Sequence, residues 1–405
     1  MKRLILASLA VAALASCSKE STEDVAITSS KTQMEFTTYA STATAKGTPV
    51  NSNSDFKGTN NLFSVSAYFT ATSSLNSGKY FSFSDVKYIG STWVNQSQMY
   101  YPNESGTLYF GAYYPSDDTK ITSASYEYNS GHDLSFDYTV ADAVTSQRDV
   151  MYAIKDYSYT SETEDSINLH FKHALTQIAF TATKDSDIDV TVTGISICNV
   201  NEEGTFSASV VTDDSGQNDE TIASANVDTD NFGEWKDQKT AQNYAAVMTS
   251  DEAITVTSDT DATALSNSTD ALMLIPQELT AWDTDEGTTS DTGSYLAIKC
   301  KISHAAGDDT VGYASIVDGI VFVPFDTDNI KYAEGDVDDG WRAGYKITYN
   351  LHFGGGYTYP DGGTIPEPGT VPDPDDVVET LRTITYTTSV DEWVPASGST
   401  SATVE

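Results

Sequence analysis

The sequence is poor in cysteine and in basic residues. Among 405 residues it has 3 cysteines and 21 Lys and Arg, against 59 Asp and Glu, which gives a formal net charge of −38. A surface of this sign repels phosphate backbones and anionic lipid headgroups, so we expect no nucleic-acid partner. The cysteines form no Cys-x-x-Cys pair, and a zinc site is therefore not expected.

Familiar catalytic patterns are also missing. The sequence contains no His-Glu-x-x-His, Gly-x-Ser-x-Gly or phosphate-binding glycine motif. His170 and His173 lie close together without a further His or Cys nearby, so we interpret them as structural. The run Glu334–Gly340 resembles a calcium loop but lacks the full spacing and the later Glu, which favours a solvated turn. We predict no enzyme activity, no metal and no cofactor.

Long apolar runs are absent, and the one short run has a specific context. Leu4–Leu14 is about 11 residues long, whereas a membrane-spanning helix needs about 20. The run follows Lys2 and Arg3 and ends in Leu-Ala-Ser-Cys, which is typical of a bacterial lipoprotein signal. We therefore expect cleavage before Cys17 and a lipid on Cys17; an ordinary secretory signal with an incidental cysteine is the alternative. The chain would then leave the cytoplasm tethered to a membrane.

Helical periodicity is missing as well. No segment of 12 or more residues shows it, whereas the 24 tyrosines and the abundant Ser and Thr suit pleated sheets. Short alternating runs separated by turn residues predict an all-β sandwich protein. Cys198 and Cys300 both lie in strand-like runs, where they would either pair or remain as buried thiols.

Several segments together resemble the fimbrillin family of Bacteroidales, the shaft and accessory subunits of type V pili. Besides the lipoprotein signal, the matching segments are TATAKGTPV, MYYP followed by LYFGAYYP, LHFKHALTQIAF, GWRAGYKITYNLHF and TITYTTSVDEWV. The resemblance implies two tandem transthyretin-like β-sandwich domains and a C-terminal donor strand. It also implies removal of the first strand by a protease, followed by polymerisation through strand donation. In the family the cut usually follows an Arg; the matching residue here is Lys46.

The residues predict the same organisation. Removing Met34–Tyr39, with Met34 and Phe36 on its apolar face, would open a groove and leave backbone groups unpaired, a template for another strand. The alternating segment Leu381–Val394 follows a proline-rich linker and is the predicted donor, through Ile384, Tyr386, Val390 and Trp393. The predicted ranges are 1–16 signal, 17–46 propeptide with the first strand, 47–166 and 167–356 sandwich domains, and 357–405 linker and donor strand.

The sequence therefore predicts a structural subunit of adhesive fimbriae at the cell outer membrane, with both donor and acceptor parts as in a shaft. The expected partners are other fimbrial subunits, a maturation protease, the outer membrane through the lipid, and an unknown host or bacterial surface ligand. An anchored surface lipoprotein that binds glycans or host proteins, or a tip or anchor subunit, is the alternative. For glycan binding, Trp235 and Trp282 lie in polar loops and could be exposed. A glycan hydrolase would need two facing carboxylates, which the sequence does not single out.

Overall fold

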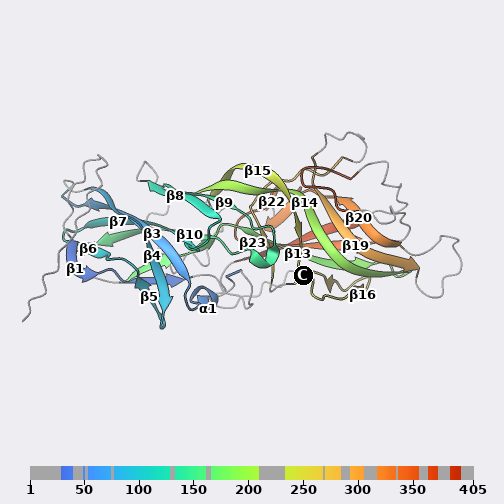
Figure 1. The fold of residues 1–405 in the computed structure, drawn as a ribbon, viewed down its shortest axis with the longest axis horizontal. Coiled ribbons are helices and arrows are strands. Elements are labelled where there is room, and N and C mark those ends of the chain that lie inside the picture. The colour runs from blue at the N-terminus through green and yellow to red at the C-terminus, as the bar shows by residue number, and fades with distance from the viewer. Residues whose placement is uncertain are drawn as a thin grey trace, which may run out of the picture.

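The computed structural model describes residues 29–39, 49–50, 53–73, 77–127, 133–160, 166–208, 233–267, 270–283, 292–304, 317–333, 336–354, 364–372 and 384–393. The regular structure of these residues is nearly all β-strand, which confirms the predicted all-β class. Helix is limited to the single turn α1 (Asn53–Phe56) and the 3₁₀ turn η1 (Val144–Ser146). Figure 1 shows an elongated molecule with the first strands at one end.

A six-stranded sheet forms that end of the molecule, in the order β12-β10-β7-β3-β4-β5. Its strands, in chain order, are β3 (Leu62–Ala71), β4 (Ser77–Ile89), β5 (Thr92–Asn95), β7 (Gly106–Tyr114), β10 (Met151–Tyr159) and β12 (Lys172–His173). Two small sheets complete the region, β1 (Ser29–Gln33) with β6 (Tyr100–Pro102) and β2 (Phe36–Tyr39) with β11 (Ile167–His170).

The central strands of this sheet are buried on both faces. Phe63 and Phe110 point into one apolar core, whereas Tyr68 belongs to a second core that includes Tyr126. A glycine at 111 allows this packing, because a Cβ there would lie 2.4 Å from the Tyr126 ring. The sequence alternates less clearly here because both faces are covered.

A second large sheet of seven strands contains β14 (Ile188–Ala208), a strand of 21 residues. The other six strands are β8 (Ile121–Glu127), β9 (Asp133–Thr139), β15 (Glu234–Ala245), β16 (Ile254–Val256), β19 (Tyr295–His304) and β20 (Val317–Pro324). One part of β14 pairs with β19 and another part with β9. The division near residue 167 stays a prediction, and this sheet joins strands from both sides of it.

A five-stranded sheet includes β17, β13, β23 and β24 in that order, with β18 also paired to β13. The strands are β13 (Thr176–Lys184), β17 (Thr263–Ala264), β18 (Leu272–Leu274), β23 (Tyr345–Phe353) and β24 (Thr385–Glu392), and a separate hairpin pairs β21 (Ile330–Ala333) with β22 (Asp336–Asp338). The alternation slips at His173–Leu175 because the chain passes there from β12 to β13, in another sheet. No helical turn forms at this point.

Several side chains whose state the sequence left open are buried or half-buried. Trp282 is 2% exposed, so the expectation that it could be exposed is wrong. Trp235 is half-buried: it packs against Phe136 and Phe206, and its indole N–H donates to the Ala174 carbonyl. The remaining cysteines, Cys198 and Cys300, are buried free thiols.

Candidate functional site

The N-terminal segment fills the core of the first sheet. Met34 is 1% exposed and Phe36 is 4% exposed, and both belong to the same apolar core as Phe63 and Phe110. The Phe36 ring meets the rings of Phe63 and Phe110 edge to face, at centroid distances of 6.3 and 5.9 Å. Burial of the two side chains contributes about 1.5–3 kcal/mol each. These residues therefore close the core rather than lie upon it.

The backbone of this segment is paired on both sides. β1 runs antiparallel to β6, and the Met34 N–H donates to the Met99 carbonyl at 2.8 Å. β2 then runs parallel to β11, with Phe36 opposite Ile167, and the Ile167 N–H donates to the Glu35 carbonyl. Within the described residues, β11 has β2 as its only ladder partner. Loss of the segment would leave β11 as an open strand.

Two side chains of β5 clamp the segment. The Trp93 indole N–H donates to Thr38 Oγ1 at 2.7 Å, and Asn95 Nδ2 donates to the Met34 carbonyl at 2.7 Å. Trp93 is held in turn by the rings of Phe56 and Phe63, with centroids at 5.3 and 4.8 Å. Because Thr38 is only 4% exposed, this donor and acceptor satisfy each other away from solvent.

We call the groove that residues 34–38 occupy the N-terminal groove, and the positions of Met34, Phe36 and Thr38 in it are its first, third and fifth seats. Residues of β3, β5, β7 and β11 line it, namely Phe63, Trp93, Phe110 and Ile167. The predicted displaced residues Met34 and Phe36 both lie in it. Cys17 and Lys46, the predicted lipidation and cleavage residues, lie outside the described residues.

The chain after the predicted cleavage residue is anchored by a buried pair. The Val50 N–H donates to Asp149 Oδ2 at 2.8 Å, and His173 Nδ1 lies 2.9 Å from the same oxygen. Asp149 and His173 are 0% and 2% exposed. His173 also stacks on Trp393, with 3.9 Å between the ring centroids. Trp393 is therefore a packing partner of this histidine, which we interpret as structural. Val50 and Trp393, the last described residue, thus meet at one buried pair.

The C-terminal strand lies on its own chain. β24 pairs antiparallel with β23 over eight positions, from Tyr345 opposite Glu392 to His352 opposite Thr385. Ile384 and Trp393 are 6% exposed, Tyr386 and Val390 are half-buried, and the alternate residues face solvent. β24 has β23 as its sole ladder partner in the described part of the chain, so it is an edge strand.

The linker before this strand is also docked rather than extended into solvent. The Gly369 N–H donates to Asn199 Oδ1 at 2.8 Å, and Asn199 Nδ2 donates to the Thr370 carbonyl at 2.9 Å. Asn243 Nδ2 donates to the Pro366 carbonyl. The described part of the linker, residues 364–372, therefore follows a fixed path along the domain.

Two hydrogen bonds hold the start of β24 on its own chain. The Tyr386 hydroxyl donates to Asp326 Oδ1 at 3.1 Å and accepts from the Asp326 N–H at 3.1 Å. Its ring packs against Phe325 and Tyr349. Burial raises the pKa of this hydroxyl above its ordinary value, and the Asp326 carboxylate opposes ionisation further. Tyr386 is therefore a neutral donor at physiological pH.

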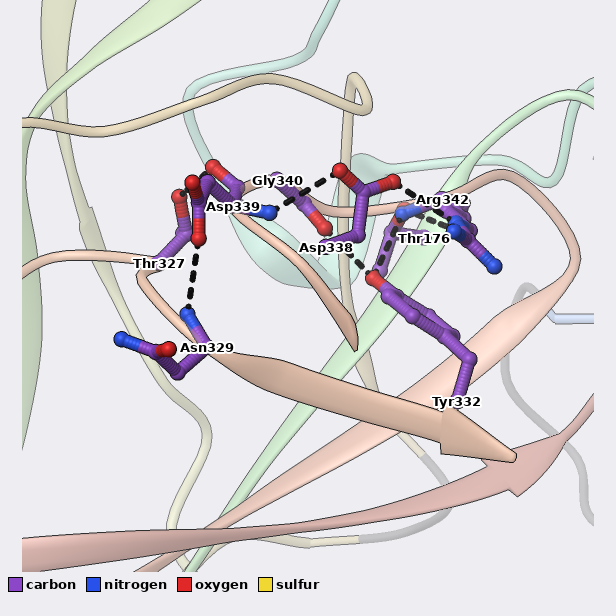
Figure 2. A network of polar contacts seen from close by, with 8 residues as sticks. All are labelled: Thr176, Thr327, Asn329, Tyr332, Asp338, Asp339, Gly340 and Arg342. Carbon is purple, nitrogen blue, oxygen red and sulfur yellow. Dashed lines mark hydrogen bonds and ion pairs between the residues drawn. The ribbon is translucent and has the colours of Figure 1, made fainter. Parts of the chain in front are cut away.

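The acidic turn beside this bond is tied into the fold (Figure 2). Asp338 Oδ2 accepts from Arg342 Nε at 2.8 Å, and Asp339 Oδ1 accepts from the Asn329 N–H at 3.1 Å. The Tyr332 hydroxyl donates to the Gly340 carbonyl at 2.6 Å. These acids bind protein groups, and Asp336–Asp338 form strand β22 rather than the predicted turn. Among the described residues no group of three or more His, Cys, Asp or Glu is arranged to hold a metal.

Sequence reasoning missed the partners of the candidate residues. Nothing in the local pattern marks Trp93 or Asn95 as contacts of residues 34–38, since they lie about 60 positions away and are brought there by the sheet. Asp149 was missed for the same reason. An aspartate followed directly by Val150 and Met151 was the available signal, because a buried acid needs a partner.

Comparison with known proteins gives a family. Residues 48–367 match the fimbrillin-like family. This chain belongs to that family. The resemblance stated from the sequence motifs is thereby confirmed, and no curated protein sequence matches the chain.

Solved structures of fimbrial proteins are similar to this fimbrillin-like chain. A fimbrial protein from Bacteroides vulgatus is 17% identical, with a TM-score of 0.56, covering 89% of this chain and 99% of its own. The tip fimbrial protein from Porphyromonas gingivalis is 10% identical, with a TM-score of 0.34, covering 86% and 97%. The first likeness supports the all-β fold. In the described part of the chain, no helix is long and apolar enough to cross a membrane.

Proposed function

We propose that this fimbrillin-like chain is a structural subunit of adhesive fimbriae that polymerises by donor-strand exchange. It is exported as a lipoprotein on Cys17 and cut after Lys46, which frees residues 34–38 from the N-terminal groove. β24 of another subunit then enters that groove. The role is structural rather than enzymatic, and the product is a head-to-tail fibre at the outer-membrane surface.

The burial of Phe36 and Met34 carries this proposal. An N-terminal segment that closed no core could be lost without consequence, whereas these side chains are almost fully buried. Their loss would expose the rings of Phe63 and Phe110 and the open strand β11. Apolar surface combined with an unpaired strand is a site for addition of another strand.

The chain also supplies a strand of the required kind. β24 is an edge strand that alternates inward and outward residues, and it follows a linker long enough in sequence to carry it elsewhere. Possession of both a groove and a donor suits a shaft subunit. A tip subunit needs no donor, and an anchor retains its lipid.

The N-terminus of the protein on the cell tests this proposal. Sheared surface fibres should contain a chain that begins at Gly47, and deletion of residues 379–405 should abolish ladders on heated, unboiled gels. A cell-surface chain that begins at lipidated Cys17 would instead support an anchored binding lipoprotein. Ladders formed by the deletion variant would show that this strand is not the donor.

A further inference from the structure

Two segments, one near each end of the described residues, share the same residue pattern. Residues 34–38 read Met-Glu-Phe-Thr-Thr, and residues 384–388 read Ile-Thr-Tyr-Thr-Thr. In order, each has an aliphatic residue, a polar residue, an aromatic ring and two threonines. The first segment occupies the N-terminal groove, and the second lies in β24, the proposed donor.

The pattern is the same in space as in sequence. In the groove, Met34, Phe36 and Thr38 are buried, whereas Glu35 and Thr37 are exposed. In β24 and just before it, the inward positions are again the first, third and fifth: Ile384 is buried and Tyr386 and Thr388 are half-buried, whereas Thr385 and Thr387 are exposed. Both segments therefore present side chains of matching size and polarity on one face.

The groove requires an acceptor at its fifth position. Trp93 donates to Thr38 Oγ1 from a position fixed by surrounding aromatic rings. A strand without an oxygen there would leave the indole N–H without its partner in a partly buried place, which is costly. Thr388 is the residue of the pattern that offers this hydroxyl.

We propose that the donor strand enters the groove in the register that seats Ile384, Tyr386 and Thr388 where Met34, Phe36 and Thr38 lay. This inference rests on the proposed function and specifies its partner, a second copy of this chain. Trp93 of the acceptor then donates to the hydroxyl of Thr388, and Asn95 donates to the carbonyl of Ile384. Trp93 is thus the residue that determines the register.

Neighbouring registers fit less well. A shift of one residue turns the donor over and points Thr385 and Thr387 into the apolar groove. A shift of two residues in one direction places Thr388 at the third seat, where the Phe36 ring lay (the aromatic seat). It also places Val390, which has no side-chain oxygen, against Trp93. A shift of two in the other direction places Ile384 in the aromatic seat and the ring of Tyr386 against Trp93. Only the proposed register matches all three seats.

Disulfide trapping tests the register directly. In the precursor, Thr37 lies opposite Asn168 of β11, with Thr37 Oγ1 3.4 Å from Asn168 Oδ1. The proposed register places Thr387 there. The full chain with Asn168→Cys and Thr387→Cys is cut by limited trypsin digestion until it begins at Gly47, then left to polymerise and oxidise. We expect a covalent ladder on a non-reducing denaturing gel.

Matched variants control the geometry. Asn168→Cys with Thr385→Cys or with Ser389→Cys displaces the thiol by two residues, roughly 6.6 Å along the strand, which is beyond the reach of a disulfide. Asn168→Cys with Thr37→Cys in the uncut precursor should close within one chain and so show that the position accepts the bond. Thr388→Val should slow polymerisation about tenfold, whereas Thr385→Val, which replaces an exposed side chain in the place of exposed Glu35, should leave the rate unchanged.

Each outcome has a definite meaning. A covalent ladder at position 387 together with the Thr388→Val effect supports the register. A covalent ladder at 385 or 389 instead, or equal rates for the two valine variants, overturns the register while strand exchange stands. If the chain that begins at Gly47 forms no polymer even without substitutions, the proposed function fails and this inference fails with it.

Discussion

The substitution Tyr386→Phe should distinguish two states of β24: its stored state, paired with β23 of its own chain, and its proposed exchanged state in the N-terminal groove of another chain. In its own chain the Tyr386 hydroxyl makes two contacts with Asp326, both 3.1 Å long. The phenyl ring left by the substitution matches Phe36, the residue that this side chain is proposed to replace. The substitution therefore weakens the stored state without removing any contact of the proposed exchanged state. We expect Tyr386→Phe to polymerise faster than the unaltered chain.

The structure gives the size of this effect. A hydrogen bond contributes about 0.5–1.5 kcal/mol net, and one to a charged group about 1.5–3 kcal/mol. Because Tyr386 and Asp326 are only half-buried, a loss of about 1–2 kcal/mol is appropriate. This corresponds to a rise of about 5- to 30-fold in the fraction of chains whose β24 has left β23. The substitution should leave the N-terminal groove of the precursor unchanged.

Two measurements check the prediction. Amide hydrogen exchange in residues 385–392 of the uncut precursor should accelerate by the same factor, while exchange in β3 and β7 stays as before. The rate of ladder formation after cleavage should rise in parallel. Thr385→Val, which changes an exposed residue of the same strand, is the control. A Tyr386→Phe chain that exchanges faster but polymerises more slowly would refute the proposed seat of this ring.

Three further predictions concern the rest of the fold. Asp149→Ala should leave two buried groups unpaired, the Val50 N–H and the His173 ring, and so lower the free energy of unfolding by about 1–3 kcal/mol for each. Denaturant unfolding measures this change. The matched control Asp142→Ala, at an exposed position, should leave the free energy of unfolding unchanged. Burial raises the pKa of Tyr114 to about 12, so the folded state keeps a proton that the unfolded state releases above pH 10. The contribution of this one proton to stability should be full below pH 10 and be lost at about 1.4 kcal/mol per pH unit up to pH 12. Tyr114→Phe should therefore make the fall in alkaline unfolding shallower by that slope, and an unchanged slope would contradict this. Burial likewise raises the pKa of Cys198 to about 12, so a thiol reagent at pH 8 should label it only after unfolding.

The sequence predicts individual strands better than their partners. Strict alternation over residues 345–353 is visible in the sequence and coincides with the bounds of β23, because one face of this strand is buried and the other is half-buried. The pairing of β9 with β14 joins residues near 136 to residues near 206, and no local pattern encodes it. Likewise, alternation at 34–39 predicted an inward face, but the clamp from Trp93 depends on the path of β4 and β5.

The inward side chains of β24 are less buried on their own chain than the matching side chains are in the N-terminal groove, and this difference favours the proposed strand exchange. On its own chain, Tyr386 and Thr388 are half-buried, whereas Phe36 and Thr38 in the groove are each 4% exposed. Moving the donor therefore buries more apolar surface, at about 25 cal/mol for each Å². Against this stands the contact of Trp393 with His173, which holds β24 on its own sheet. While residues 34–38 fill the groove, β24 has no better place than its own sheet, so the proposed cleavage after Lys46 would be the step that makes the proposed transfer favourable.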